Sequence, residues 1–273
     1  MFLSRYRQTV DTYAPLLGRS YRLLRDAIYF RHFVQTKYGF RIAGDSRIAQ
    51  DNWEVDQIDA FLELIKTHDV VLDLGANIGI YSCLAASRGK HVIAVEPSPR
   101  NLKFLYRNLL ENRFNNVEVF PLALAQQCGI QKIYGFGDTA SLIPGWAHAR
   151  KAQPGLAPAI TLDAIAAGRF QNKKLLVKMD VEGYELEVLR GATEILDSRV
   201  KPTWMIEIGL CNDYIPGGIN HNFTATFDMF WKRGYQCRMI HFPLTLVTQD
   251  DIGRWVNNGI ISPQNASFLF WVD

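Results

Sequence analysis

The sequence lacks any long, uninterrupted apolar run. Hydrophobic residues make up 48% of its 273 residues, yet the longest apolar stretch, VVLDLGANIGIYSCLAA, is broken by Asp, Asn and Gly. No segment of about 18 uncharged apolar residues is therefore available to span a membrane. A secretory signal peptide is not expected either, because Arg5 and Arg7 stand where its apolar core would lie. Both absences predict a cytoplasmic protein.

Cysteine is scarce, and the charges nearly balance. The four cysteines have no C-x-x-C spacing of the kind found in zinc or redox sites, so we expect reduced thiols. The 30 Lys and Arg residues against 27 Asp and Glu residues give a net charge of +3. That charge is too small to indicate a nucleic-acid-binding protein.

Positive charge is nevertheless concentrated near the N-terminus. Residues 1–44 contain eight Lys and Arg residues against two Asp residues, interleaved with Tyr and Phe. We expect a basic, partly helical arm that ends in a hairpin over residues 35–44, followed by one domain over residues 45–273. The arm could make weak contact with an anionic membrane surface. Alternatively, it is a solvated helix whose aromatic side chains pack on the main domain.

The rest of the chain alternates strand-like and helix-like segments. Short runs rich in Val, Ile and Leu (DVVLDLG, HVIAVEP, NVEVFPLALA, KKLLVKMD and PTWMIEIG) are separated by segments of helical periodicity. This alternation predicts a Rossmann-like α/β fold, a mostly parallel sheet with helices on both faces. YQCRMIHF and SFLFWVD can supply closing strands. Residues 129–158, rich in Gly, Pro and aromatic residues, interrupt the rhythm and predict a substrate-facing loop.

The segment DLGANIG, after the first of these strands, predicts a nucleoside-cofactor site. Glycine between a strand and a helix lets a ligand approach the backbone closely, but Asn77 departs from the G-x-G-x-x-G spacing of dinucleotide folds. Asp73 would repel a diphosphate and attract the cationic S-adenosylmethionine. Glu96 ends the next strand, about 20 residues later, where a carboxylate reaches ribose hydroxyls. The expected cofactor contacts are Asp73, Gly75, Ala76, Asn77, Gly79, Glu96 and Pro97.

Three carboxylates stand at the ends of the later strands. Asp180, Glu182 and Glu207 would meet at the carboxyl edge of a parallel sheet, where ligands gather, and one of them could act as a general base. Alternatively, Asp180 or Glu182 caps the following helix.

Other residues offer further alternatives. A divalent metal ion is a less favoured possibility, with Asp180, Glu207 and either Asn212 or Asp213 as ligands. Our primary expectation is that there is no metal site. The alternative bases are His148, His221 and His241.

Several segments together resemble the FkbM-type methyltransferase family. They are VVLDLGANIGIYS, AVEPSPRNLKFLYRNLLEN, ITLDAI, LLVKMDVEGYELEVLRGA and MIEIG, within residues 38–209. The run KMDVEGYE is the most specific, because no generic Rossmann pattern explains it. The resemblance implies a class I methyltransferase fold, use of S-adenosylmethionine, and usually O-methylation of a small molecule, sugar or natural product. By position, it assigns Asp73, Gly75, Asn77 and Gly79 to the cofactor loop and Glu96 to the ribose, and it matches Asn101 and Asn108 to family asparagines.

The sequence thus predicts an S-adenosylmethionine-dependent methyltransferase that acts on a hydroxyl of a sugar, glycan precursor or secondary metabolite. Two alternatives stay open. An NAD-dependent oxidoreductase or epimerase would also use Glu96 to bind a ribose. A binding or scaffold protein could keep the fold, and even the cofactor, without turnover.

Overall fold

The structure is a computed structural model that describes residues 24–44, 47, 54–135, 137–148, 154–211, 214–261 and 266–273. Its contacts divide the chain into two compact units, Met1–Trp53 and Glu54–Asp273. The sequence had suggested a boundary after residue 44. In the first unit, a helix over residues 24–31 precedes β1 (Val34–Gln35) and β2 (Arg41–Ile42), which pair antiparallel and confirm the expected hairpin. Residues 1–23, which carry much of the basic charge, lie outside the described part, so membrane contact stays a prediction.

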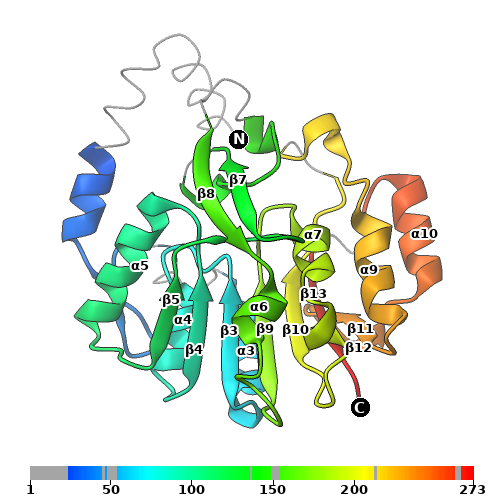
Figure 1. The fold of residues 1–273 in the computed structure, drawn as a ribbon, viewed down its shortest axis with the longest axis horizontal. Helices are drawn as coiled ribbons and strands as arrows, with labels where there is room; N and C mark the ends of the chain where they lie inside the picture. The colour runs from blue at the N-terminus through cyan, green and yellow to red at the C-terminus, as the bar shows by residue number, and fades with distance from the viewer. Residues whose placement is uncertain are drawn as a thin grey trace. The chain divides into compact units, whose positions relative to one another are not determined.

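The second unit contains an eight-stranded, mostly parallel sheet (Figure 1). In spatial order its strands are β12 (Phe242–Leu246), β11 (Gln236–Met239), β13 (Ser267–Trp271), β10 (Thr203–Glu207), β9 (Leu175–Met179), β3 (Val70–Leu74), β4 (His91–Val95) and β5 (Val117–Phe120). Five are mutually parallel, β5, β4, β3, β9 and β10, whereas β13 runs antiparallel to β10. The chain moves outward from β3 in both directions, and ligands bind at such a switch point, beyond the carboxyl ends of the strands.

Helices cover both faces of this sheet, which explains why its central strands are continuous apolar runs. Leu72 and Leu74 of β3 belong to a core with α6 (Leu162–Ala166), α7 (Glu185–Arg190), α8 (Thr193–Leu196) and α9 (Phe223–Trp231). Side chains alternate along a strand, so Asp73 faces the opposite side, where Ser82 of α4 (Ile80–Ala86) contacts it. On that side α3 (Val55–Thr67) packs on α4, and α5 (Pro99–Glu111) follows β4. The predicted fold class is confirmed.

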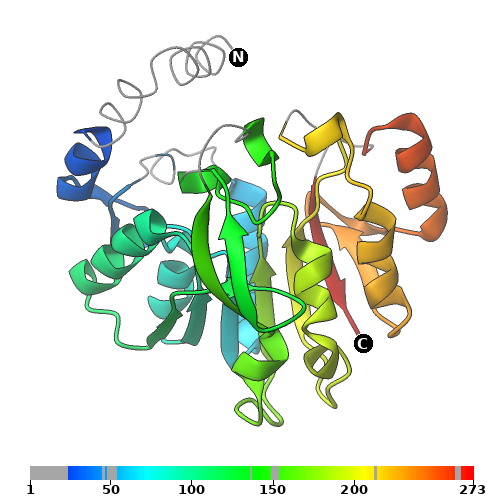
Figure 2. The same ribbon diagram turned by 45° about the horizontal axis from the view of Figure 1, so that its top comes forward.

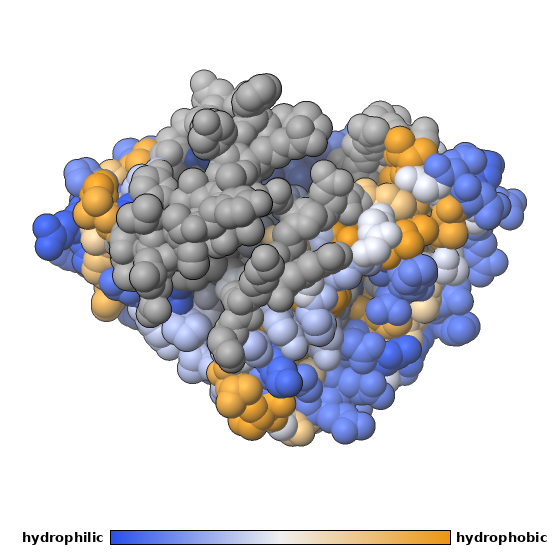
Figure 3. Space-filling view, turned by 90° about the horizontal axis from the view of Figure 1, so that it is seen from above, coloured by the Kyte–Doolittle hydropathy of each residue, from blue (hydrophilic) through white to orange (hydrophobic). Residues whose placement is uncertain are grey.

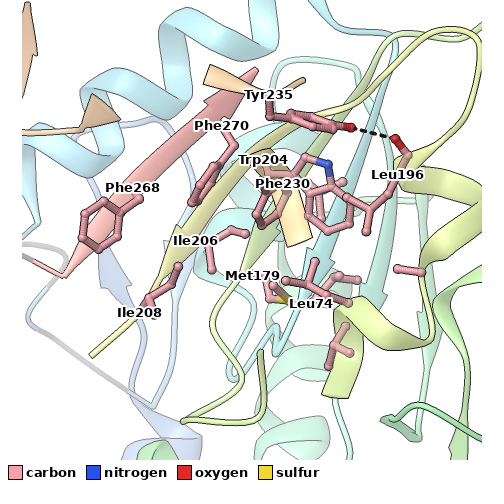
Figure 4. Packing of buried hydrophobic residues seen from close by; sticks show 14 of the residues in the cluster. Leu74, Met179, Leu196, Trp204, Ile206, Ile208, Phe230, Tyr235, Phe268 and Phe270 are labelled. Atoms are coloured by element: carbon pink, nitrogen blue, oxygen red, sulfur yellow. Dashed lines mark hydrogen bonds between the residues drawn. The ribbon is translucent and has the colours of Figure 1, made fainter. Parts of the chain in front are cut away.

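Aromatic side chains fill the core at the antiparallel end of the sheet (Figure 4). Phe230 of α9 stacks on Phe270 of β13, with ring centroids 4.0 Å apart, and Trp204 of β10 meets Phe230 edge-on at 5.6 Å. The Tyr235 hydroxyl donates to the Leu196 carbonyl at 3.3 Å. Burying one large apolar side chain contributes about 1.5–3 kcal/mol, so this cluster anchors α9 and the closing strands.

The insertion is wrongly predicted as a loop, because it forms most of a second sheet. β6 (Ala123–Leu124), β8 (Gly155–Ile160) and β7 (Gly129–Ile133) pair in that order. Their core is small and consists of Ala123, Ala125, Ala157 and Ala159. The 3-10 turns η2 (Gly137–Thr139) and η3 (Trp146–His148) lie between β7 and β8. Figures 1 and 2 show this green sheet near the end of the central sheet toward which β3 and β9 point.

Two further details differ from the sequence prediction. The helix expected over residues 182–199 is two short helices, α7 and α8. Between them lies Gly191, which packs so closely on Ala125 that a Cβ on Gly191 would stand 2.3 Å from the Ala125 carbonyl oxygen. The sequence also missed α10 (Gln249–Asn258), which begins with a reciprocal capping box between Thr248 and Asp251. η4 (Pro216–Gly218) is a short turn before α9. Within the described residues, every helix is too short or too polar to cross a bilayer.

Candidate active site

A cavity lies beyond the carboxyl ends of β3, β4 and β9. The turn after β3, the end of β4, β6, residues 137–142 of the insertion and the turn after β9 line it. Figure 3 views the molecule from this side, where the described surface is mainly hydrophilic, with hydrophobic residues in separate patches. The insertion therefore contributes to the cavity wall, although it does so as a folded sheet and not as the expected loop.

The glycine turn brings β3 against the end of β9. Gly75 has φ +81°, and a Cβ on it would lie 1.9 Å from the Asp180 carbonyl oxygen. The N–H groups of Gly75 and Ala76 donate to the Val95 carbonyl at 2.9 and 3.0 Å. At Gly79, with φ +91°, a Cβ would lie 2.4 Å from Leu105 Cδ1. Both glycines thus permit close packing that no larger residue allows.

Only some of the predicted cofactor contacts line the cavity. Gly75, Asn77, Glu96 and Pro97 do so, whereas Asp73, Ala76 and Gly79 are not among its lining residues. Asp73 is buried and accepts a hydrogen bond from Ser82 Oγ at 2.6 Å. Burial raises the pKa of Asp73 to about 6. Any attraction that Asp73 exerts on a cationic ligand therefore acts through space.

Hydrogen bonds to both carboxylate oxygens hold Glu96 in the cavity wall. The Asn77 N–H donates to Glu96 Oε2 at 2.8 Å, and Oε1 accepts from the Ser98 N–H at 2.8 Å and from Asn101 Nδ2 at 3.3 Å. Burial raises the pKa of Glu96 to about 7. Because Oε2 accepts one hydrogen bond from the described residues, it retains a lone pair for a ligand hydroxyl. Asn101 also lines the cavity, whereas Asn108 donates to the Ile78 carbonyl at 2.8 Å and supports the turn.

The three predicted catalytic carboxylates come together. Asp180 and Glu182 line the cavity, and Glu207 is exposed at the end of β10. The negative charge of Asp180 raises the pKa of Glu207 to about 7, whereas burial and then the charge of Asp180 raise the pKa of Glu182 to about 9. Neither Asp180 nor Glu182 caps a helix, since α7 begins after Tyr184 without a side-chain cap. The structure thus contradicts the capping alternative.

Residues that the sequence analysis missed surround these carboxylates. Lys178, only 5% exposed, places Nζ 3.7 Å from Asp180 Oδ2 and 5.1 Å from the centroid of the Tyr81 ring. The Tyr81 hydroxyl donates to Glu54 Oε2 at 2.9 Å. Burial lowers the pKa of Lys178, but the attraction of Asp180, Glu207 and other carboxylates outweighs it, so the pKa is raised overall. The available signal was a lysine inside the apolar run LLVKM.

Two hydrogen bonds join the insertion to the turn that contains Glu182. Trp146 Nε1 donates to Glu182 Oε2, and Ser141 Oγ donates to the Glu182 carbonyl, both at 2.7 Å. A Cβ on Gly183 would lie 2.4 Å from the Trp146 ring. Glu182 is therefore held by the insertion as well as placed at the cavity wall.

The described structure gives little support to the histidine bases or to the metal site. The His148 side chain lies outside the described part, His221 is exposed, and His241 Nδ1 lies 3.0 Å from Asp56 Oδ2. Neither His221 nor His241 lines the cavity. Among the described residues, no group of three His, Cys, Asp or Glu side chains is arranged to hold a metal ion. Asn212 and Asp213, two of the suggested ligands, lie outside the described residues.

Known proteins share sequence with this chain over the same region. Residues 73–237 match the family model described as the methyltransferase FkbM domain. The chain is 31% identical over 166 residues to "Hexuronic acid methyltransferase AglP" of Haloferax volcanii, covering 56% of this chain and 62% of that protein. It is 31% identical over 85 residues to "Uncharacterized protein MJ1452" of Methanocaldococcus jannaschii, covering 31% of this chain and 30% of that protein. The chain therefore matches less than two thirds of the length of either relative.

Solved structures show only a distant likeness. A putative O-methyltransferase from Klebsiella pneumoniae has a TM-score of 0.46 at 11% identity, covering 82% of this chain and 83% of that one. A precorrin-6y C5,15-methyltransferase from Geobacter metallireducens has a TM-score of 0.42 at 14% identity, covering 72% and 78%. The family match, in contrast, spans more than half of the chain. The chain belongs to the FkbM methyltransferase domain family, a family of S-adenosylmethionine-dependent methyltransferases.

Proposed function

We propose that the protein transfers the methyl group of S-adenosylmethionine to a hydroxyl of a sugar, glycan precursor or similar small polyhydroxylated molecule. The observation that carries this proposal is the position of Asp180, which both lines the cavity with Glu96 and belongs to the carboxylate cluster beside it. The printed name of the Haloferax relative, a hexuronic acid methyltransferase, supports a sugar as the acceptor class.

The residues of the cavity fit S-adenosylmethionine. Gly75 leaves the backbone open, and Glu96 offers a buried carboxylate whose free lone pair can accept from a ribose hydroxyl. The buried Asp73 and the nearby carboxylates make the region attractive to a cation. When bound, the cofactor supplies an electrophilic methyl group on a positively charged sulfur.

An aliphatic hydroxyl needs help to act as a nucleophile, because its acidity is roughly that of water, with a pKa of about 15.7. A carboxylate whose pKa lies near the working pH is an effective general base, and the negative charge of Asp180 raises the pKa of Glu207 to about 7. We therefore assign the base to the Asp180 and Glu207 pair. Glu182 accepts the Trp146 N–H, and its pKa of about 9 keeps it protonated near neutrality, which suits a positioning role.

A second candidate reaction is methylation of a sugar carboxyl group. It is suggested by the hexuronic acid in the relative's name. A carboxylate acceptor needs no general base, and the cluster of Asp180, Glu207 and Glu54 would repel it. The same cluster suits hydroxyl groups, which donate hydrogen bonds to carboxylates. We therefore favour the hydroxyl.

The proposal can be tested with purified protein, methyl-labelled S-adenosylmethionine and a panel of p-nitrophenyl hexosides and hexuronides. We expect calorimetry to detect cofactor binding and mass spectrometry to find a methyl ether on a hexoside. Labelled methyl esters on the hexuronides alone would support the second reaction. Failure to bind S-adenosylmethionine, with protection by NAD in thermal-shift assays, would favour the oxidoreductase alternative. Cofactor binding without transfer to any acceptor would favour the scaffold alternative.

A further inference from the structure

The ammonium group of Lys178 is buried but poorly bonded. Its side chain is 7% exposed and carries three N–H donors, which a buried cation normally satisfies with hydrogen bonds. In the part of the chain that the structure describes, its polar contact is the ion pair with Asp180 at 3.7 Å, longer than a hydrogen bond. The Tyr81 ring lies on another side of Nζ at 5.1 Å. Donor capacity is therefore left over for a ligand.

The strand register shows where this ammonium group lies. Lys178 pairs with Asp73 of β3 on one side and with Met205 of β10 on the other. Side chains alternate along a strand, so Asp180 and Glu207, each two residues further on, lie on the same face as Lys178. Lys178 thus stands below the carboxylate pair at the carboxyl edge of the sheet, next to the wall that Asp180 contributes to the cavity.

The charges around Lys178 keep it cationic. Asp180, Glu207, Glu54 and Asp73 all raise its pKa, and Lys178 in turn lowers the pKa of Glu207. An ammonium held in this way stays charged over the working range of the enzyme. It can therefore stabilise negative charge that develops on a neighbouring oxygen.

We propose, building on the methyl transfer proposed above, that Lys178 is a catalytic residue whose Nζ donates a hydrogen bond to the acceptor hydroxyl oxygen, while the Asp180 and Glu207 pair takes the proton of that hydroxyl. The acceptor O–H bond breaks and its proton passes to a carboxylate. The oxygen forms a bond to the methyl carbon as the bond from that carbon to sulfur breaks, and the electron pair of the broken bond stays on sulfur. The products are a methyl ether and S-adenosylhomocysteine.

Tyr81 supports this arrangement through its contact with Lys178. Its ring packs edge-on against Phe61 of α3, with centroids 5.0 Å apart, and its hydroxyl is committed to Glu54. The ring face that meets Lys178 offers a cation–π contact and no hydrogen-bond acceptor. Tyr81 therefore positions the ammonium group without using up its donors.

Lys178→Met tests the role, because it removes the charge and the donors from a side chain of similar length. We expect S-adenosylmethionine affinity within about threefold of wild type. We also expect kcat/KM for the accepted p-nitrophenyl hexoside to fall by about 10²–10³, the usual effect of losing one such donor. The acid limb of the kcat/KM profile should move to higher pH, because Lys178 no longer lowers the pKa of Glu207. Lys174→Met, at an exposed lysine just before the same strand, is the matched control and should behave as wild type.

Lys178→Arg is the second variant, and it still tests the proposed role of Lys178 if Lys178→Met does not fold. It keeps the charge but displaces the donors, so we expect at least a tenfold loss of kcat/KM with cofactor affinity retained. Wild-type kcat/KM and an unmoved acid limb, in either folded variant, would overturn the assignment of Lys178. A wild-type protein that binds S-adenosylmethionine and methylates no hexoside would instead contradict the proposed function, and with it the reaction on which this role depends.

Discussion

Glu96→Gln removes one charge from the cavity wall with almost no change in side-chain volume. The carboxylate accepts hydrogen bonds on both oxygens, from the Asn77 N–H on one and from Ser98 and Asn101 on the other. An amide has one acceptor oxygen and one NH2 group, so it must turn a donor toward one of these donors. Leaving one buried donor unsatisfied costs about 1–3 kcal/mol.

The effect on cofactor binding should be similar in size to the effect on the fold. A ribose hydroxyl that donates to a carboxylate makes a charge-assisted hydrogen bond worth about 1.5–3 kcal/mol. At about 1.4 kcal/mol for each factor of ten, its loss predicts roughly 10- to 150-fold weaker binding of S-adenosylmethionine. The pKa of Glu96 in the free protein is about 7, and hydroxyl donors favour its ionised form, so wild-type affinity should decrease as the pH falls below about 7. In the glutamine variant that pH dependence should be absent.

Isothermal titration calorimetry at pH 6, 7 and 8.5 measures both effects. The matched control is Glu118→Gln, the same change at a half-exposed carboxylate on β5 that is bonded to Arg169. That variant should bind the cofactor as wild type does, and thermal unfolding would show that both variants are folded. If Glu96→Gln bound with wild-type affinity and wild-type pH dependence, the assignment of Glu96 to the ribose would be refuted.

Three further perturbations follow from the same contacts. Gly75→Ala places a Cβ against the Asp180 carbonyl at positive φ. Strain and overpacking of about 2–5 kcal/mol should lower the Tm by at least about 4 °C. An unchanged calorimetric Tm would contradict the close approach of Gly75 to Asp180. Trp146→Phe keeps an aromatic ring, smaller than the indole, but loses the N–H bond to Glu182. Hydrogen exchange in residues 137–148 should accelerate while the global Tm changes little, and unchanged exchange would argue against this attachment. Burial raises the pKa of Glu185 to about 8, so the native state binds more protons than the unfolded state, and stability falls as the pH rises from about 4.5 to 8. The Tm of Glu185→Gln should therefore increase relative to that of wild type as the pH rises. A constant difference in Tm from pH 5 to 9 would show that Glu185 does not titrate in this way.

The sheet was predictable because its central strands are short runs that are apolar except for single charged residues, Asp73 in β3 and Lys178 in β9. In β3 and β9 every residue is buried, which is how strands covered on both faces read in a sequence. The insertion was not predictable in the same way, because its inward-facing residues are alanines, which give little contrast with their neighbours. The break between α7 and α8 depends on the approach of Gly191 to Ala125, which are far apart in the sequence. Such a contact leaves no local pattern.

The site was predictable at the strand ends and less so within the strands. Glu96 and Asp180 follow their strands directly, so the parallel topology brings both to the cavity. In a strand buried on both faces, alternation does not reveal which face turns toward a ligand. The hydrogen bond between Asp73 and Ser82 was therefore not predictable from the local pattern. Lys178 was missed for a related reason. Its place below the Asp180 carboxylate becomes apparent only when the register of the neighbouring strands is known.

The alanine core of the second sheet has an evolutionary consequence. Ala157 and Ala159 of β8 pack with Ala123 and Ala125 in a cluster separate from the large core beneath the central strands. Exchange of the connection between β7 and β8 would therefore preserve the large core of the central sheet, while it would change residues 137–142 of the cavity wall and the contacts of that connection with Glu182. Sequence change in this segment would therefore alter the shape and polarity of the cavity without requiring any change in the strands of the central sheet.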